Sequence, residues 1–598
     1  MAHMPLYANK NGVEIEHLGV NNTLVRVTGE GKYLLLPIQE SNDEATINVI
    51  IDGKLQKSIN ARLAKSKVDY TVPLYIEDFK GKNIVLNIVT SQGRSSVREA
   101  KEDACWPIFE VTDSFNTANR EKYRPAYHHT PLWGWMNDPN GMVYKDGKWH
   151  LCYQWNPYGS KWQNLSWGQS TSEDLVHWEH QELPALEPDG LGMIFSGSSA
   201  IDKTGSAGFG KDAIVTMFTS AAASQIQSLA SSTDGGRTYD VYPGNPVLTL
   251  ESEARDPNMF WDEKAGQWVL TLAHALDHEM LIFTSPDMKE WTLQSRFGQG
   301  LGAQDGVWEC PDLFEIPIAG TDEKKWVLLC NINPGGPFGG SATQYFVGDF
   351  DGKVFTPDTD KDGNVKTKWL DYGKDHYATV SFSDAPDNRR TVIGWMSNWQ
   401  YAAEVPTMQF RSANTLPREI GLFRAADGEL YASSAPSPEL DAIRGKLAVN
   451  AGKTSIGKKG KQFQLPAAND GICEIIAEFN ALKSDSVTLT LTNTAGEKVA
   501  MTYNNLDRTM SFDRRHSGIT DFSENFPAVT VSPTFENDGK VSLRIFIDRS
   551  SIEMFGNNGQ FVMTNLVFPN KPYSTLTVSA NGGNARLNSL KIYSLNVN

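Results

Sequence analysis

Two short units recur along the middle of the chain, and they constrain the fold more than any other feature of the sequence. The first unit reads SEDLVHW at 172–178 and SPDMKEW at 285–291, with a degenerate copy, STDGGRTY, at 232–239. The second reads KDGKW at 145–149, DEKAGQW at 262–268 and DEKKW at 322–326. The second unit joins a turn to an aromatic residue and an apolar strand. Strand-and-turn repeats of roughly 50–60 residues are typical of β-propellers, and residues 121–432 are long enough for about five blades.

The flanking regions also predict strands, so the fold class is all-β. Residues 5–115 contain β-branched runs, for instance at 47–51 and 82–89, bounded by turn residues, which predict a sandwich-like N-terminal domain. It has no acidic cluster, so carbohydrate binding and a spacer role both stay open, and its removal is expected to leave turnover of short substrates intact. Residues 433–445, with two prolines, predict a linker. Residues 446–598 alternate apolar and polar side chains and predict a C-terminal β-sandwich.

Composition excludes several classes of partner. A chain of 598 residues is too long for one core, so several domains are expected. The net charge of −16 argues against nucleic acid or an anionic membrane surface and fits a neutral substrate. No apolar run reaches transmembrane length. The five cysteines are scattered without a CxxC pair, so neither a zinc site nor a disulfide framework is predicted.

Three short acidic motifs, each containing a proline, stand out. They are WMNDPNG at 135–141, RDP at 255–257 and WECPD at 308–312. A single motif of this kind is an ordinary Asx turn. Three of them at domain-scale spacing indicate one site assembled from three places in the fold, since motifs from different propeller blades converge on the central channel. Asp138, Asp256 and Glu309 are therefore the candidate catalytic carboxylates.

In this order the motifs resemble glycoside hydrolase family 32, the β-fructofuranosidases, which include invertases, inulinases and levanases. The resemblance extends to QWNP at 154–157, FSGS at 195–198 and GWMSNW at 394–399, and it covers roughly residues 121–598. It implies a five-bladed propeller followed by a β-sandwich. It also implies a retaining hydrolase that releases fructose from levan, inulin, fructo-oligosaccharides or sucrose, mostly from chain ends, with no cofactor and no metal.

The resemblance assigns a role to each carboxylate. Asp138 is the expected nucleophile, held ionised by hydrogen-bond donors such as Asn137. Glu309 is the expected acid/base, with its pKa raised by an apolar setting near Trp308 and Cys310. Asp256 is expected to stabilise the transition state. The residues expected to bind substrate are Asn137, Gln154, Trp162, Phe195, Ser196, Arg255, Asp375 and Trp395. Core packing is the alternative for Trp162 and Trp395, and the His after Asp375 departs from the family pattern.

Other functions stay open at this point. A fructosyltransferase uses the same covalent step with a sugar as acceptor, and sequence does not separate it from a hydrolase. A non-catalytic fructan-binding protein is disfavoured because all three carboxylates are present, and the first motif argues against an inverting five-bladed furanosidase. The preference for β-2,1 or β-2,6 linkages is open. The opening MAHM is typical of a recombinant leader, so it carries no information on export. The expected location is periplasmic, secreted or cell-surface, in a bacterium.

Two further acidic patterns resemble functional sites but are predicted to be structural. DTDKDG at 358–363 starts like a calcium-binding EF-hand loop, but the twelfth position is Trp369 and no helices flank it, so an acidic hairpin is predicted. Asp548 and Glu553 could form a carboxylate pair, but their strand-and-turn context predicts structural roles.

Overall fold

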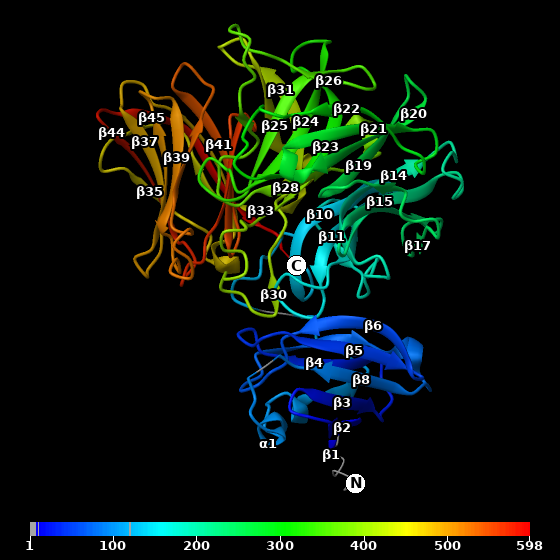
Figure 1. Cartoon of the computed structure of the whole chain (residues 1–598). Helices are drawn as coiled ribbons and strands as arrows, with labels where there is room; N and C mark the ends of the chain where they lie inside the picture. Colours follow the sequence, from blue (N-terminus) through cyan, green and yellow to red (C-terminus); the bar gives the residue numbers. More distant parts are fainter. Residues whose placement is uncertain (1–6, 10, 92, 119–120, 598) are drawn as a thin grey trace, which may run out of the picture.

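The chain forms three β-rich bodies in sequence order, shown in blue, cyan to yellow, and orange to red in Figure 1. This computed structural model describes residues 7–9, 11–91, 93–118 and 121–597. Among these residues, no helix is both long enough and apolar enough to cross a lipid bilayer.

The N-terminal body is a sandwich because its strands bury alternate side chains. Along β5, Ala45, Ile47, Val49 and Ile51 all point into the core. One sheet has the strand order β1 (Tyr7–Asn9), β2 (Val13–His17), β3 (Asn22–Val27), β8 (Ile84–Val89), β5 (Ala45–Ile51), β6 (Lys54–Ala61). The other is β7 (Tyr70–Tyr75), β4 (Tyr33–Ile38), β9 (Glu110–Thr112). The short helix α1 (Val97–Lys101) begins at Ser96, whose hydroxyl accepts the Glu99 backbone N–H.

Five antiparallel sheets follow. Each is given from its innermost strand outward. The first two are β10 (Gly134–Lys145), β11 (Lys148–Asn156), β12 (Ser166–Ser172), β13 (Glu179–His180), and then β14 (Met193–Asp202), β15 (Ala213–Ala221), β16 (Gln225–Ser232), β17 (Asp240–Val241), with β18 (Leu248–Thr249) also on β16. The third is β19 (Ala254–Asp262), β20 (Gln267–His274), β21 (Glu279–Ser285), β22 (Thr292–Phe297). The fourth is β23 (Val307–Pro317), β24 (Lys324–Asn333), β25 (Ala342–Phe350), β26 (Phe355–Pro357), with β27 (Lys368–Trp369) also on β25, and the fifth is β28 (Tyr377–Ser381), β29 (Thr391–Trp395), β31 (Arg418–Arg424), β32 (Leu430–Pro436).

These sheets close into a ring, which is the predicted five-bladed propeller. Each innermost strand contacts the next one around the ring, and β28 contacts β10. The short strand β30 (Phe410–Arg411) pairs in parallel with β10. Both sequence repeats occupy equivalent turns in the blades. The KDGKW-type unit joins the first two strands of a blade, and the SEDLVHW-type unit joins the third to the fourth. In the latter, the carboxylates of Asp174 and Asp287 accept backbone N–H groups of the turn.

The C-terminal body is the predicted β-sandwich. One sheet has the order β33 (Arg444–Ala451), β45 (Ala585–Leu595), β36 (Cys473–Asn480), β41 (Lys540–Ile547), β42 (Ser551–Gly556), β43 (Phe561–Leu566), with β34 (Thr454–Ile456) also on β45. The other is β35 (Lys461–Gln464), β44 (Thr575–Asn581), β37 (Ser486–Thr492), β38 (Lys498–Asn504), β39 (Thr509–His516), β40 (Val529–Pro533). One apolar cluster fills the space between them.

Short 3₁₀ turns connect the strands: η1 (Glu77–Phe79), η2 (Trp106–Ile108), η3 (Ala275–Asp277), η4 (Pro386–Asn388), η5 (Pro438–Ile443) and η6 (Ala468–Gly471). Residues 433–445, predicted to be a linker, are the end of β32, η5 and the start of β33. Leu440 and Ile443 of η5 are buried in the cluster between propeller and sandwich. The segment is therefore ordered and packed.

Buried charges join the propeller to the C-terminal sandwich. His128 lies between Asp548 and Glu553, with each ring nitrogen 2.7 Å from a carboxylate oxygen. Arg418 of β31 bonds Glu553 at 2.5 Å and Asp371 at 2.9 Å. Burial opposes ionisation of Glu553, but Arg418 and His128 outweigh it and hold its pKa at about 2. Asp548 and Glu553 are thus bound at a domain interface.

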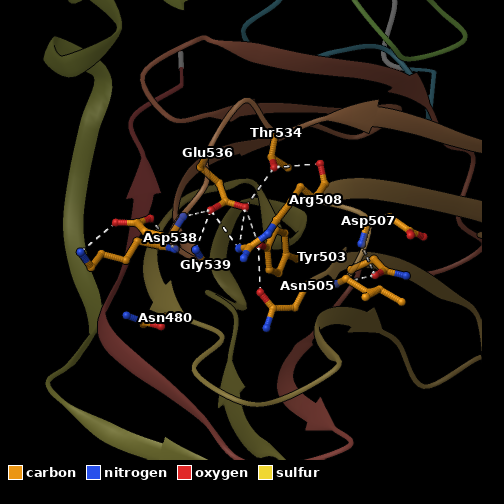
Figure 2. Close-up of polar contacts among 12 residues, drawn as sticks. Asn480, Tyr503, Asn505, Asp507, Arg508, Thr534, Glu536, Asp538 and Gly539 are labelled. Atoms are coloured by element: carbon orange, nitrogen blue, oxygen red, sulfur yellow. Dashed lines mark hydrogen bonds and ion pairs between the residues drawn. The ribbon is translucent and has the colours of Figure 1, made fainter. Parts of the chain in front are cut away.

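A second polar network lies within the C-terminal sandwich (Figure 2). The carboxylate of Glu536 accepts bonds from Tyr503, Arg508 and Thr534 and from two backbone N–H groups of the following turn. Its oxygens are occupied by these partners, so the network fastens one loop to the end of β38 and offers no open carboxylate to a ligand.

Candidate active site

The five innermost strands share one irregularity, and it places the candidate side chains at the axis of the propeller. In each strand the pairing with its neighbour shifts register within the first few residues, and β10 shifts a second time at Asn140/Val143. The first shifts fall at Met136/Pro139, Ile194/Gly197, Arg255/Asn258, Glu309/Asp312 and Tyr377/Val380. Such bulges re-aim side chains and are common beside active sites. Asp256 and Cys310 adopt left-handed φ angles of 65° and 46°, a conformation that is uncommon for residues other than glycine.

A cavity of about 220 Å³ opens where the bulges meet. It contains Asp138, Asp256 and Glu309, as the motifs predicted, and six of the residues expected to bind substrate. Its lining is Asn137, Asp138, Gln154, Trp162, Leu165, Phe195, Ser196, Gln225, Glu253, Arg255, Asp256, Glu309 and Trp399.

Asp138 and Asp256 are buried and share one neighbour, Cys310. Asp138 accepts hydrogen bonds from Ser196 Oγ at 2.7 Å and from Asn137 Nδ2 at 3.1 Å. The backbone N–H of Cys310 donates to Asp256 Oδ2 at 2.9 Å, and its Sγ lies 3.5 Å from a carboxylate oxygen of each aspartate. The left-handed backbone at Cys310 thus directs both its N–H and its thiol at the acidic pair.

Glu309 lies in a polar setting. Arg255 Nε donates to one of its oxygens at 3.0 Å, and the Tyr377 hydroxyl donates to the other at 2.5 Å. The apolar surroundings expected from Trp308 and Cys310 are wrong. Alternation along β23 turns the Trp308 indole away from Glu309 into the core behind the strand. The left-handed bulge at Cys310 interrupts this alternation, and Cys310 faces the aspartates. Glu309 is positioned by a cation and a phenol.

The negative charge of Glu309 raises the pKa of both aspartates. Burial, and then the charge of Glu309, raises the pKa of Asp138 to about 6, although Ser196 and Asn137 oppose the rise. The same two causes raise the pKa of Asp256, which Arg255 only partly offsets. The donors favour the ionised form of Asp138, as expected, but burial and the charge of Glu309 outweigh them. Even so, a pKa near 6 leaves Asp138 mostly ionised at neutral pH.

Two predicted substrate residues lie outside the cavity. Asp375 is fully buried and bonds Arg514 of the C-terminal sandwich at 2.5 Å and the Leu566 backbone N–H at 2.7 Å. It is a domain-interface residue. Trp395 is also fully buried, within 6.1 Å and 4.8 Å of the rings of Trp135 and Trp399. It packs the core behind the site, which was the alternative weighed for it.

Besides the apolar Leu165, the sequence prediction missed four polar or aromatic residues of the site. Gln225 and Glu253 accept bonds from Arg255 Nη1 at 3.3 and 2.8 Å and line the cavity. They lie in no motif, so no signal pointed to them. Tyr377 lies two residues after Asp375, and Trp399 ends the GWMSNW motif at 394–399. A strand period of two puts positions 395 and 399 on the same face, so the sequence could not tell which ring lines the cavity.

No group of three or more His, Cys, Asp or Glu residues in the described ranges is arranged to hold a metal ion. In the acidic hairpin, Asp360 Oδ1 accepts the backbone N–H groups of Asp362 and Asn364, which makes it an Asx-type turn. All five cysteines are free and buried.

Comparisons with known proteins identify the family of the chain. A model of the glycosyl hydrolases family 32 N-terminal domain matches residues 128–434, and a family 32 C-terminal model matches 439–594. A domain of unknown function matches 19–127. A levanase of Bacillus subtilis is 42% identical over 495 residues, 79% of this chain and 71% of the relative. An extracellular exo-inulinase of Aspergillus awamori is 36% identical, over 79% of this chain and 94% of its own.

Solved structures give the same result. The exo-inulinase of Aspergillus awamori superposes with a TM-score of 0.75 at 35% identity, covering 81% of this chain and all of its own. A fructofuranosidase variant of Schwanniomyces occidentalis, solved with fructosylnystose, gives 0.74 at 32% identity, covering 81% and 99%. The predicted family, propeller and C-terminal sandwich are confirmed, and the chain belongs to glycoside hydrolase family 32.

Proposed function

We propose that this protein is a retaining β-fructosidase that releases fructose from the ends of fructans and from sucrose. The observation that carries the proposal is the convergence of Asp138, Asp256 and Glu309 in one small cavity at the propeller axis. The names of the relatives, levanase, exo-inulinase and invertase, point to the same substrates.

In the proposed reaction Asp138 attacks the anomeric carbon of the fructosyl unit. The bond to the leaving oxygen breaks, Glu309 gives that oxygen a proton, and an ester forms between Asp138 and the sugar. Water then attacks the ester carbon, Glu309 takes its proton, and fructose leaves. Ser196 and Asn137 fix the attacking carboxylate.

Two further residues support the chemistry. Asp256, held by the Cys310 N–H, is assigned to the sugar hydroxyls and to the positive charge that develops in the transition state. Tyr377 and Arg255 hold Glu309 from two sides, which fixes its carboxyl group for both proton transfers.

The size of the cavity favours action at chain ends. At about 220 Å³ it is smaller than the roughly 300–1,000 Å³ of drug-sized sites, so it fits a terminal sugar unit better than the middle of a chain. A levanase and an exo-inulinase among the relatives make levan and inulin the two polymers to test. The extracellular relatives support an exported protein, in the periplasm, at the cell surface or secreted.

The test is a time course of products from levan, inulin and sucrose, with and without a chelator. We expect fructose as the first and dominant product, with no effect of the chelator. Early oligosaccharides would indicate endo cleavage. Products longer than the substrate would indicate fructosyl transfer. Binding without turnover by folded protein would indicate a fructan-binding protein.

A further inference from the structure

The N-terminal domain contacts the propeller at the segment that carries Trp162. Its apolar core is continuous with the first blade, because Trp133, Tyr153, Trp155 and Tyr158 are buried in the same cluster as its strands. In Figure 1, β6 is the strand of the blue domain that faces the propeller. The domain is therefore packed against the catalytic body, with no separating spacer.

Trp162 forms one wall of the cavity. Its side chain is 39% exposed and meets the ring of Phe195 edge to face, with centroids 6.1 Å apart. It lies in the connection between β11 and β12, so no strand pairing fixes its position. On one side Asn156 Nδ2 of β11 donates to the Lys161 carbonyl at 2.8 Å. On the other side the contacts of the two residues after Trp162 hold the connection, and both of these residues bind the N-terminal domain.

Asn164 pairs with the open edge of β6. Its backbone is left-handed, with φ of 48°, and its buried carboxamide accepts the Asn60 N–H at 2.8 Å and donates to the Asn60 carbonyl at 2.7 Å. These are the two groups that an added strand would bond, since β6 is the edge of its sheet. The same carboxamide donates to Asn156 Oδ1 at 3.0 Å, so one side chain ties edge strand, connection and β11 together.

Gln163 makes the adjoining contact. Its amide donates to Glu44 Oε2 at 3.0 Å, and Arg62 binds the other oxygen of Glu44 at 3.4 Å. Gln163 Oε1 accepts the Asn164 N–H at 3.2 Å, which couples the two contacts. Glu44 is thus held by its own domain and holds the residue that follows Trp162.

The start of the same connection is also fastened to the N-terminal domain. Lys57 donates to the Tyr158 hydroxyl at 3.1 Å, and the Tyr70 hydroxyl accepts the Ser160 N–H at 3.0 Å. The N-terminal domain therefore binds the connection on both sides of Trp162, between residues 158 and 164.

We propose that the N-terminal domain positions Trp162 and so sets how tightly the cavity binds its saccharide, with Glu44 as a positioning residue. The proposal rests on the proposed function for its kinetic arm only. Because Trp162 lines the cavity wall without reaching the carboxylates in any hydrogen bond described above, loosening it should weaken ground-state and transition-state binding alike. Such a change raises KM and leaves kcat nearly unchanged.

The kinetic test compares Glu44→Ala with two controls on sucrose and fructo-oligosaccharides. Losing one hydrogen bond should raise KM about 2- to 10-fold and change kcat less than about 2-fold. Glu44→Gln keeps an acceptor for Gln163 and should stay close to the wild type. Lys32→Met removes a different contact between the same two domains, the 2.8 Å ion pair with Glu182, and should leave KM unchanged. In a Trp162→Ala background, Glu44→Ala should add no further rise in KM.

A second arm needs no activity. Hydrogen–deuterium exchange of the amides between 158 and 165 should be faster in Glu44→Ala than in the wild type and unaltered in Lys32→Met. If the wild type has no fructosidase activity, the proposed function fails while this arm still tests the positioning role. Unchanged exchange and KM in Glu44→Ala would overturn the inference. So would KM effects of Glu44→Ala and Trp162→Ala that multiply in the double variant.

Discussion

Replacing Asp138 by Asn should abolish activity and, at neutral pH, make the protein more stable. The pKa of Asp138 lies at about 6 in the folded protein, against about 3.9 in an unfolded chain. A carboxyl group whose pKa is raised by folding binds more protons in the native state, so its contribution to stability falls as pH rises between these values. At about 1.4 kcal/mol for each pH unit, ionised Asp138 costs the fold about 3 kcal/mol above pH ~6.

The amide removes that cost. It also weakens one of the hydrogen bonds that Asp138 accepts from Ser196 and Asn137, which is worth about 1 kcal/mol. The expected net gain is about 1–2 kcal/mol at pH ~7.5. It should fall towards zero or below near pH ~4, where Asp138 is protonated in the folded protein and about half protonated in the unfolded chain. Thermal unfolding of both proteins across this range measures it. An Asn variant that is less stable than the wild type at pH ~7.5 would refute the reasoning. So would a variant whose stability gain at pH ~4 is as large as its gain at pH ~7.5.

Four more outcomes follow from the structure. Glu309→Gln should lose most of its activity on fructans, whose leaving groups need acid catalysis worth about 10²–10⁴-fold. With an activated aryl fructoside the variant should form the covalent intermediate quickly, and azide should rescue its turnover. Equal first-step rates on both substrates would contradict this. Tyr377→Phe should lower kcat/KM about 10- to 100-fold with unchanged folding, since it removes a charge-assisted bond to Glu309. Burial opposes protonation of His128, but Asp548 and Glu553 raise its pKa to about 9. The stability that protonated His128 adds should therefore be complete below pH ~6.5 and be lost as the pH rises through ~9. Thermal unfolding of the wild type across this range should show the loss, and the His128→Gln variant should not. Deleting the N-terminal domain should give poorly soluble protein, because it uncovers the apolar cluster shared with the first blade.

That last outcome revises the expectation from sequence that the N-terminal domain is dispensable. The residues that bind it to the propeller, such as Asn164 and Gln163, are ordinary polar residues in a loop. Their partners lie about a hundred positions away in the chain, and only tertiary structure brings them together. Sequence reasoning therefore identified the domain but not its docking surface.

The repeats and the three motifs were the predictable part of the structure. The repeated turns fixed the blade period, and a propeller requires motifs on its innermost strands to converge, so Asp138, Asp256 and Glu309 could be placed together in advance. The left-handed bulges that aim these side chains carry no sequence signal beyond the neighbouring prolines.

Residue-level environment was harder to predict. Asp375 was assigned from the segment that contains it, but its side chain pairs with Arg514, far along the chain in another domain. Trp395 and Trp399 belong to one motif, and only the path of the chain after β29 decides which ring reaches the cavity. The donors to Glu309 come from two other blades, so its polar setting was not visible from Trp308 and Cys310.

The central claim is that Asp138 forms a covalent bond to the sugar. The most direct measurement is mass spectrometry of the Glu309→Gln variant quenched during turnover of an activated fructoside, followed by digestion. We predict that the peptide containing Asp138 gains the mass of one fructosyl unit, and that azide removes the adduct. An adduct on the peptide containing Asp256, or turnover in which no peptide ever carries a sugar, would contradict the account.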